Sequence, residues 1–110
     1  MAYDETLAAR VRDALAGRET IVERQMFGGL GFLYHGNMCT GVRGDALIIR
    51  LGDKAEEALA EPHVRPFSSD NGARTMTGWA LVDPPGIATD EQLETWVDRS
   101  VAFTGTLPPK

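Results

Sequence analysis

Residues 26–34 read Met-Phe-Gly-Gly-Leu-Gly-Phe-Leu-Tyr, and residues 35–38 continue with His-Gly-Asn-Met. Bulky apolar residues and glycines are therefore adjacent within one β-forming segment. Glycine lacks a Cβ atom, so Gly28 and Gly29 predict a kink, a bulge or a close approach by another part of the chain. We interpret residues 21–34 as one long strand bent at these glycines; two strands separated by them are the alternative. The pattern implies no reacting group and is first of all a structural signature.

Residues 35–51 predict the rest of an antiparallel meander. His35-Gly36-Asn37 is typical of a tight turn into a strand over residues 38–42, and Gly44-Asp45 of a two-residue hairpin into a strand over residues 46–51. In this last strand Leu47, Ile49 and Leu51 alternate with Ile48 and Arg50. One face of it is therefore expected to be buried, and the other to be at most half covered.

Three helices are expected around these strands. The first begins after a plausible N-cap, Asp4, and ends at Gly17. Asp53 with Glu56 resembles a capping box, which predicts a short helix closed by Pro62. A second capping box precedes a long terminal helix, whose one apolar face would place Trp96 at the centre of the core. The capping residues of that helix are Thr89 and Gln92.

Two more strands are expected over residues 64–67 and 76–82, separated by a loop-like run over residues 68–72. The order along the chain is then α-β-β-β-α-β-β-α. This order predicts a two-layer α+β fold, with an antiparallel sheet that carries the helices on one face. At 110 residues and 43% hydrophobic content, residues 1–110 fit a single domain that needs no metal or disulfide for its core.

Composition argues against several classes of protein. The 16 acidic and 11 basic residues give a net charge of −5, which repels a phosphate backbone. No apolar run approaches the roughly 18 residues that span a bilayer, and the first residues do not resemble a signal peptide. The single Cys39 cannot form an intramolecular disulfide. We therefore expect a cytoplasmic protein that is not a membrane protein.

Residues that usually carry catalysis are scarce. Cys39 and His35 lie near the same predicted turn, but spacing suggests no third partner for a catalytic triad, so Cys39 is interpreted as a structural thiol. One cysteine and two histidines fall short of a zinc site. Tyr34 stands where a dinucleotide-binding loop would need its third glycine. The sequence thus predicts no enzyme, no cofactor and no metal.

Arginines gather on the expected strands and their loops, whereas the two later helices are acidic. If several of them share the open face of the sheet, they form a basic patch suited to an acidic protein, a phosphate or a nucleic-acid backbone. The alternative is scattered surface charge, because side-chain alternation cannot be assigned to a face without the strand register. The arginines in question are Arg24, Arg43, Arg50, Arg65 and Arg74.

Several landmarks follow one another along nearly the whole chain, and in this order they resemble the TfoX N-terminal domain family. They are Met26-Phe27-Gly28-Gly29, Phe32, Gly36, Met38, residues 47–50, Pro66-Phe67, Trp79 with Pro84, and Leu93 with Trp96-Val97. The resemblance implies a two-layer α+β fold and a relation to the TfoX/Sxy regulators, which promote natural competence together with the cyclic-AMP receptor protein in some bacteria. It supplies no catalytic residues. Because the sequence ends at Lys110, we expect a stand-alone copy without the C-terminal domain of those regulators.

These observations favour a non-enzymatic interaction module, with a transcription co-regulator as the specific case. It would bind a protein partner through the sheet face or the glycine region. The candidate interaction residues are Arg24, Gly28, Gly29, Arg43, Arg50 and Arg74. Exposed strand edges would also allow a homodimer.

Two other functions stay open at this point. A small-molecule-binding protein or enzyme would use a pocket between helix and sheet, with His35, Arg50 or Arg74 as polar contacts. Direct nucleic-acid binding would show an affinity that falls steeply with added salt.

Overall fold

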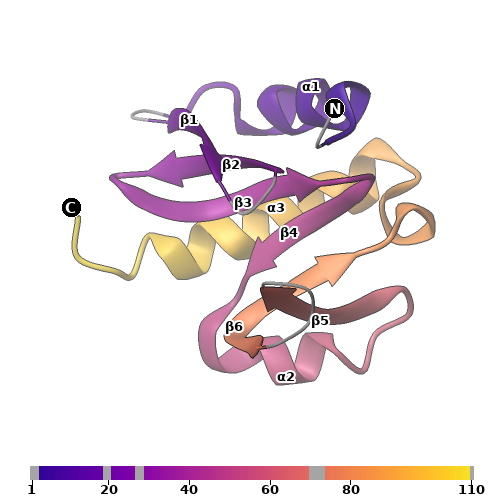
Figure 1. Cartoon of the computed structure of the whole chain (residues 1–110). Coiled ribbons are helices and arrows are strands. Elements are labelled where there is room, and N and C mark those ends of the chain that lie inside the picture. The colour runs from indigo at the N-terminus through magenta and orange to yellow at the C-terminus, as the bar shows by residue number, and fades with distance from the viewer. Residues whose placement is uncertain (1–2, 19–20, 27–28, 70–73, 110) are drawn as a thin grey trace.

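The structure is a computed structural model that describes residues 3–18, 21–26, 29–69 and 74–109. Its centre is a six-stranded antiparallel sheet with the strand order β1-β2-β3-β4-β6-β5 (Figure 1). The strands are β1 (Ile21–Met26), β2 (Gly29–Tyr34), β3 (Asn37–Arg43), β4 (Ala46–Arg50), β5 (Val64–Ser69) and β6 (Arg74–Val82). Neighbours in the sequence are mostly neighbours in the sheet, so the fold is built largely from hairpins.

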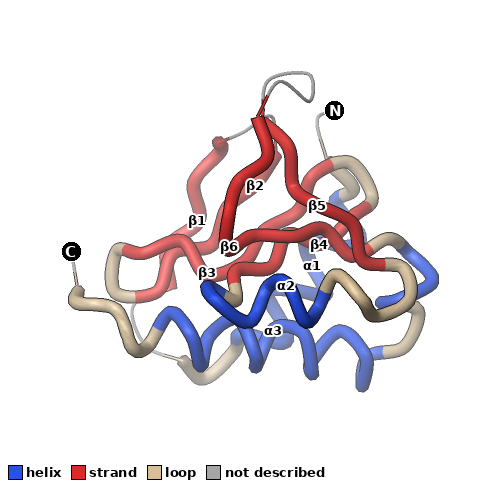
Figure 2. Tube along the Cα trace, turned by 90° about the horizontal axis from the view of Figure 1, so that it is seen from below, coloured by secondary structure: helices blue, strands red, loops and turns tan. Residues whose placement is uncertain are grey.

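The helices lie together on one face of this sheet, as Figure 2 shows from the side. They are α1 (Glu5–Leu15), α2 (Ala55–Ala58) and α3 (Asp90–Thr104), with the short 3-10 turns η1 (Gly52–Lys54) and η3 (Pro84–Ile87). The α+β class, the open antiparallel sheet and the order in which helices and strands follow one another are confirmed. Residues 70–72 of the expected loop and Gly28 lie outside the described residues.

The interpretation of residues 21–34 as one bent strand is wrong. Met26 pairs directly with Gly29, and the register continues without a break to Ile21 opposite Tyr34. The chain therefore reverses direction between Met26 and Gly29, and β1 and β2 form a hairpin. β1 consequently becomes an edge strand of the sheet.

Local capping signals explain two of the three helices. The carboxylate of Asp4 accepts hydrogen bonds from the backbone N–H groups of Thr6 and Leu7, which begins α1. Thr89 and Gln92 form the expected reciprocal capping box at the start of α3. The capping box expected at Asp53 is absent, because a 3-10 turn already begins at Gly52 and places Asp53 inside the turn instead of before it.

Two apolar clusters lie on opposite faces of the sheet. The larger one packs between the sheet and the helices and includes Trp96, which is only 7% exposed, as expected for a core residue. The second lies on the face without helices and is formed by Leu33, Met38, Ala46, Ile48, Phe67 and Leu81. The expectation that this face is at most half covered is wrong, since Ile48 is fully buried.

Curvature of the sheet accounts for burial on the helix-free face. In Figure 2 the strands curl away from the helices toward the ends of β2 and β5, so the sheet is bent rather than flat. Two register irregularities accompany this bend. One leaves Cys39 of β3 without a cross-strand partner, and the other lies between Pro66 and Ser68 of β5. Such bulges bend a strand and increase its twist.

Candidate functional site

The helix-free face of the sheet brings predicted arginines together. Residues directly opposite each other in antiparallel strands point to the same face. The strand registers therefore define one row of residues across the whole sheet on this face. The row runs through Arg24, Gly31, Gly41, Ile48, Leu81 and Arg65. An arginine thus stands on each edge strand, with glycines and buried apolar residues between them.

Arg43 lies on the same face, at the end of β3. It pairs with Ala46, a member of the apolar cluster there. Its guanidinium carbon is 5.4 Å from the centroid of the Phe67 ring, which is a cation–π distance. Phe67 is in turn packed against Trp79, with 6.1 Å between ring centroids. Aromatic rings from β5 and β6 therefore support an arginine of β3.

Arg50 is also on this face but is held inside the structure. Its guanidinium donates a 3.0 Å hydrogen bond to the carbonyl oxygen of Met38, and its carbon lies 4.8 Å from the Trp79 ring centroid and 5.8 Å from that of Phe103. Burial lowers the pKa of Arg50 from its ordinary value, although the group stays charged at neutral pH. These contacts tie the end of β4 to the last turns of α3, so Arg50 acts as a structural clamp.

The other predicted site residues have different positions. Gly28 lies outside the described residues, and Arg74 begins β6 opposite Ser69, where only its backbone is described. Gly29 is buried, and a Cβ atom added to it would collide with the carbonyl oxygen of Val42. The glycine is therefore required by the close approach of β2 and β3, as the sequence indicated.

Sequence reasoning missed Val22. It lies on β1 two residues before Arg24, hence on the helix-free face, and is 52% exposed. Strand alternation alone could have placed Val22 and Arg24 on a common face. The missing information was that β1 is an edge strand, because one bent strand over residues 21–34 would have no such edge.

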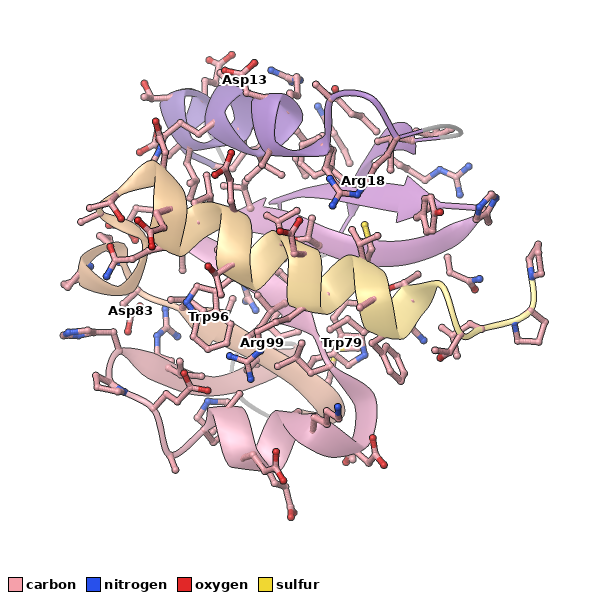
Figure 3. All side chains as sticks on the ribbon, turned by 180° about the vertical axis from the view of Figure 1, so that it is seen from behind. Asp13, Arg18, Trp79, Asp83, Trp96 and Arg99 are labelled. Carbon is pink, nitrogen blue, oxygen red and sulfur yellow. The ribbon has the colours of Figure 1, made fainter. Side chains whose placement is uncertain are left out.

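The helical layer carries charges of a different kind. Its arginines are matched by carboxylates, as in the ion pairs of Arg18 with Asp98 at 2.6 Å and Arg99 with Glu61 at 3.1 Å. Arg99 also covers the Trp96 ring, with 4.4 Å between guanidinium carbon and ring centroid (Figure 3). Exposed acidic residues outnumber the basic ones along α2 and α3. The two faces of the molecule therefore differ in charge.

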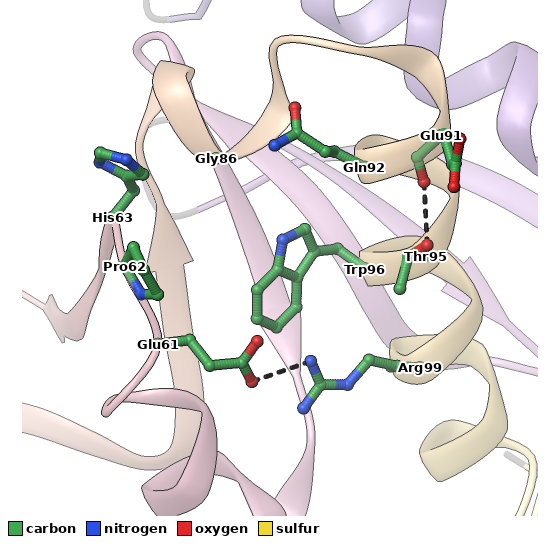
Figure 4. Close-up of a pocket in the computed structure, with 9 residues that line it drawn as sticks. All are labelled: Glu61, Pro62, His63, Gly86, Glu91, Gln92, Thr95, Trp96 and Arg99. Carbon is green, nitrogen blue, oxygen red and sulfur yellow. Dashed lines mark hydrogen bonds and ion pairs between the residues drawn. The ribbon is translucent and has the colours of Figure 1, made fainter.

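A hollow of about 320 Å³ lies between α3 and the segment before β5 (Figure 4). It is lined by Glu61, Pro62, His63, Gly86, Glu91, Gln92, Thr95, Trp96 and Arg99. Its charged residues Glu61 and Arg99 bind each other, and the Thr95 hydroxyl donates to the backbone carbonyl of Glu91. His35 and Arg50 do not line it, so this hollow lacks two of the polar contacts that the small-molecule alternative names.

Cys39 is fully buried, and its thiol donates a 3.3 Å hydrogen bond to the carbonyl oxygen of Phe32. Desolvation raises the pKa of Cys39 to about 11, so the thiol is protonated at neutral pH. Within residues 3–18, 21–26, 29–69 and 74–109, no group of three or more His, Cys, Asp or Glu side chains could hold a metal ion. No helix in these ranges is long and apolar enough to cross a membrane.

Comparison with protein families relates most of the chain to a known family. The profile of the TfoX N-terminal domain family matches residues 13–104, which include every strand of the sheet and all of α2 and α3. No curated protein matches the chain significantly.

Proposed function

Because the chain belongs to the TfoX N-terminal domain family, a family of competence-related regulator-like domains, we propose that it is a non-enzymatic protein-interaction module. In this proposal it works in the cytoplasm as a transcription co-regulator and binds an acidic surface of a protein partner. The helix-free face of the sheet is the contact surface.

The observation that carries this proposal is the segregation of charge between the two faces. Arg43 lies on the helix-free face beside the Phe67 ring, and Arg24 lies on the same face two residues from the exposed Val22, whereas carboxylates dominate the surface of α2 and α3. Arginine beside aromatic rings is characteristic of protein interfaces. The net charge of −5 opposes a nucleic-acid duplex over longer distances, which favours a protein with a local acidic patch.

Affinity capture from native lysate tests the proposal. Arg24→Glu reverses an exposed charge on the helix-free face, and Lys54→Glu makes the same charge change on an exposed residue beside α2. We expect the wild type and Lys54→Glu to retain one specific partner, and Arg24→Glu to lose it. Arg50 is unsuitable for this comparison, because its loss would break the clamp to Met38 and α3.

The proposal would be contradicted if Arg24→Glu retained the partner and Lys54→Glu lost it. That result would place the contact surface on the helical layer. Circular dichroism of both variants provides the folding control. Both substituted side chains are exposed, so neither change is expected to alter the melting temperature by more than a few degrees.

A further inference from the structure

The two edges of the sheet are not equally able to accept another strand. β5 contains Pro66, which has no N–H to donate, and its register with β6 is broken between Pro66 and Ser68. Arg65 of the same strand is bound to Asp83 at 2.9 Å. These features are typical of protected edges. Pairing by β5 is therefore disfavoured.

β1 has neither the proline nor the break in register. It contains no proline, and all six of its residues pair with β2 in one unbroken register. Its middle residues Val22, Glu23, Arg24 and Gln25 are all exposed. A regular edge strand of this kind presents a row of backbone donors and acceptors that a further strand can use.

The side chains of β1 differ between its two faces. On the helix side, Glu23 receives two hydrogen bonds from the guanidinium of Arg12, at 2.6 and 2.8 Å, so its charge is already matched. On the other side are Val22, which is 52% exposed, and Arg24, which makes no ion pair with any residue that the structure describes. The neighbour of Arg24 on β2 is Gly31, which offers no side chain.

We propose that the β1 edge binds an extended segment of the partner protein as a seventh strand, with an acidic residue opposite Arg24 and an apolar residue opposite Val22. These two residues of the segment are two positions apart, because side chains of a strand alternate between its faces. This inference rests on the proposed function and gives it a binding mode. Opposite-charge and apolar cross-strand pairs supply the selectivity, and the backbone hydrogen bonds supply affinity.

A second copy of the chain is a poorer occupant of the same edge. A two-fold axis perpendicular to the sheet would join two antiparallel β1 strands and keep the helix-bearing faces of both copies on the same side. Residues directly opposite each other would then be both even-numbered or both odd-numbered, because side chains of a strand alternate between its faces. At the axis, one residue of β1 therefore faces the same residue of the second copy. The two registers that pair five of the six β1 residues are centred on Glu23, which opposes two glutamates, and on Arg24, which opposes two arginines. Registers centred on Val22 or Gln25 avoid like charges at the axis but pair only three residues of the strand. Like charges directly opposite each other destabilise a strand pair.

A synthetic peptide tests the inference directly. The probe is an eight-residue capped peptide of sequence Thr-Ile-Thr-Glu-Thr-Ile-Thr-Glu, whose isoleucines and glutamates share one face. A control peptide carries lysine in place of both glutamates. Amide hydrogen exchange of the full chain is measured with each. We expect the glutamate peptide to slow alternate amides of residues 21–26 about tenfold or more, and to leave those of β5 unchanged.

Variants of β1 make the test specific. Arg24→Glu should weaken binding of the glutamate peptide by about fivefold or more and strengthen binding of the lysine peptide, because the charge pair is exchanged. Val22→Lys should weaken binding of the glutamate peptide, whereas Val22→Thr, which keeps a β-branched side chain, should preserve its affinity within about twofold.

Three results would overturn the inference: no protection of β1, protection of another strand instead, or no exchange of preference in Arg24→Glu. A concentration-dependent dimer in light scattering that Arg24→Glu abolishes would also overturn it, in favour of a second copy. If the peptide fails while capture from lysate still depends on Arg24, the binding mode is wrong and the proposed function stands. If capture is also independent of Arg24, both are wrong.

Discussion

Cys39 is a thiol whose chemistry is set by burial. Its pKa is raised to about 11, whereas an exposed cysteine ionises near pH 8.5. Between these values the unfolded chain loses the thiol proton and the native chain keeps it, so stability falls as the pH rises. Relative to a Cys39→Ala variant, we expect the wild type to lose about 2 kcal/mol more unfolding free energy between pH 7.5 and pH 10.5. Urea unfolding at the two pH values measures this. Equal losses in both proteins would show that the thiol ionises freely in the native state.

Gly29 is required by the close packing of β2 against β3. A Cβ atom there would collide with the backbone oxygen of Val42, which cannot move without its strand. We expect Gly29→Ala to lower the free energy of unfolding by about 2 kcal/mol or more, as overpacking does. Gly105→Ala is the control, since Gly105 has a helical φ of −63° and the atom nearest to an added Cβ, the carbonyl oxygen of Val101, is 3.3 Å away. Its unfolding free energy should change by less than about 1 kcal/mol. Equal effects in chemical denaturation would refute the steric explanation.

Of the two capping boxes predicted from the sequence, only the one that begins at Thr89 forms in the structure. Thr89 accepts a hydrogen bond from the Gln92 backbone at 3.1 Å, whereas Asp53 makes no capping bond. Thr89→Ala should therefore lower the free energy of unfolding by about 1 kcal/mol, and Asp53→Ala should change it by less than about 0.5 kcal/mol. Guanidinium denaturation of the two variants checks this. A larger loss in Asp53→Ala would mean that the capping box forms in solution.

Helices were easier to predict than strands because their signals are local. The caps at Asp4 and Thr89 lie within four residues of what they bind, so the sequence alone identifies them. The segment over residues 21–34 fits one bent strand or a hairpin equally well, and only the pairing of Met26 with Gly29 decides between them. Likewise, alternation in β4 separates Ile48 from Ile49 but does not reveal that the sheet curls and buries both.

The candidate site depends on the arrangement of the whole sheet. Arg24 and Arg43 belong to different strands, and their common face follows from the registers of β1 through β4. Composition could show that arginines favour the strands, but not that Arg50 would be bound to Met38 and covered by rings from β6 and α3. The sequence therefore left a basic patch and scattered surface charge as alternatives. Only the assembled molecule separates the exposed arginine on the edge strand from the structural one.

Burial on both faces of the sheet gives a test with two adjacent residues. Ile48 and Ile49 are both fully buried, but Ile48 belongs to the helix-free cluster and Ile49 to the core under the helices. We expect Ile48→Val and Ile49→Val each to lower the free energy of unfolding by about 1 kcal/mol. Because the two side chains lie on opposite sides of the sheet, the double variant should equal the sum within about 0.5 kcal/mol. Urea denaturation of the four proteins measures both quantities. A negligible effect of Ile48→Val would mean that the helix-free face is open to water, and strong coupling would mean that the two clusters form a single core.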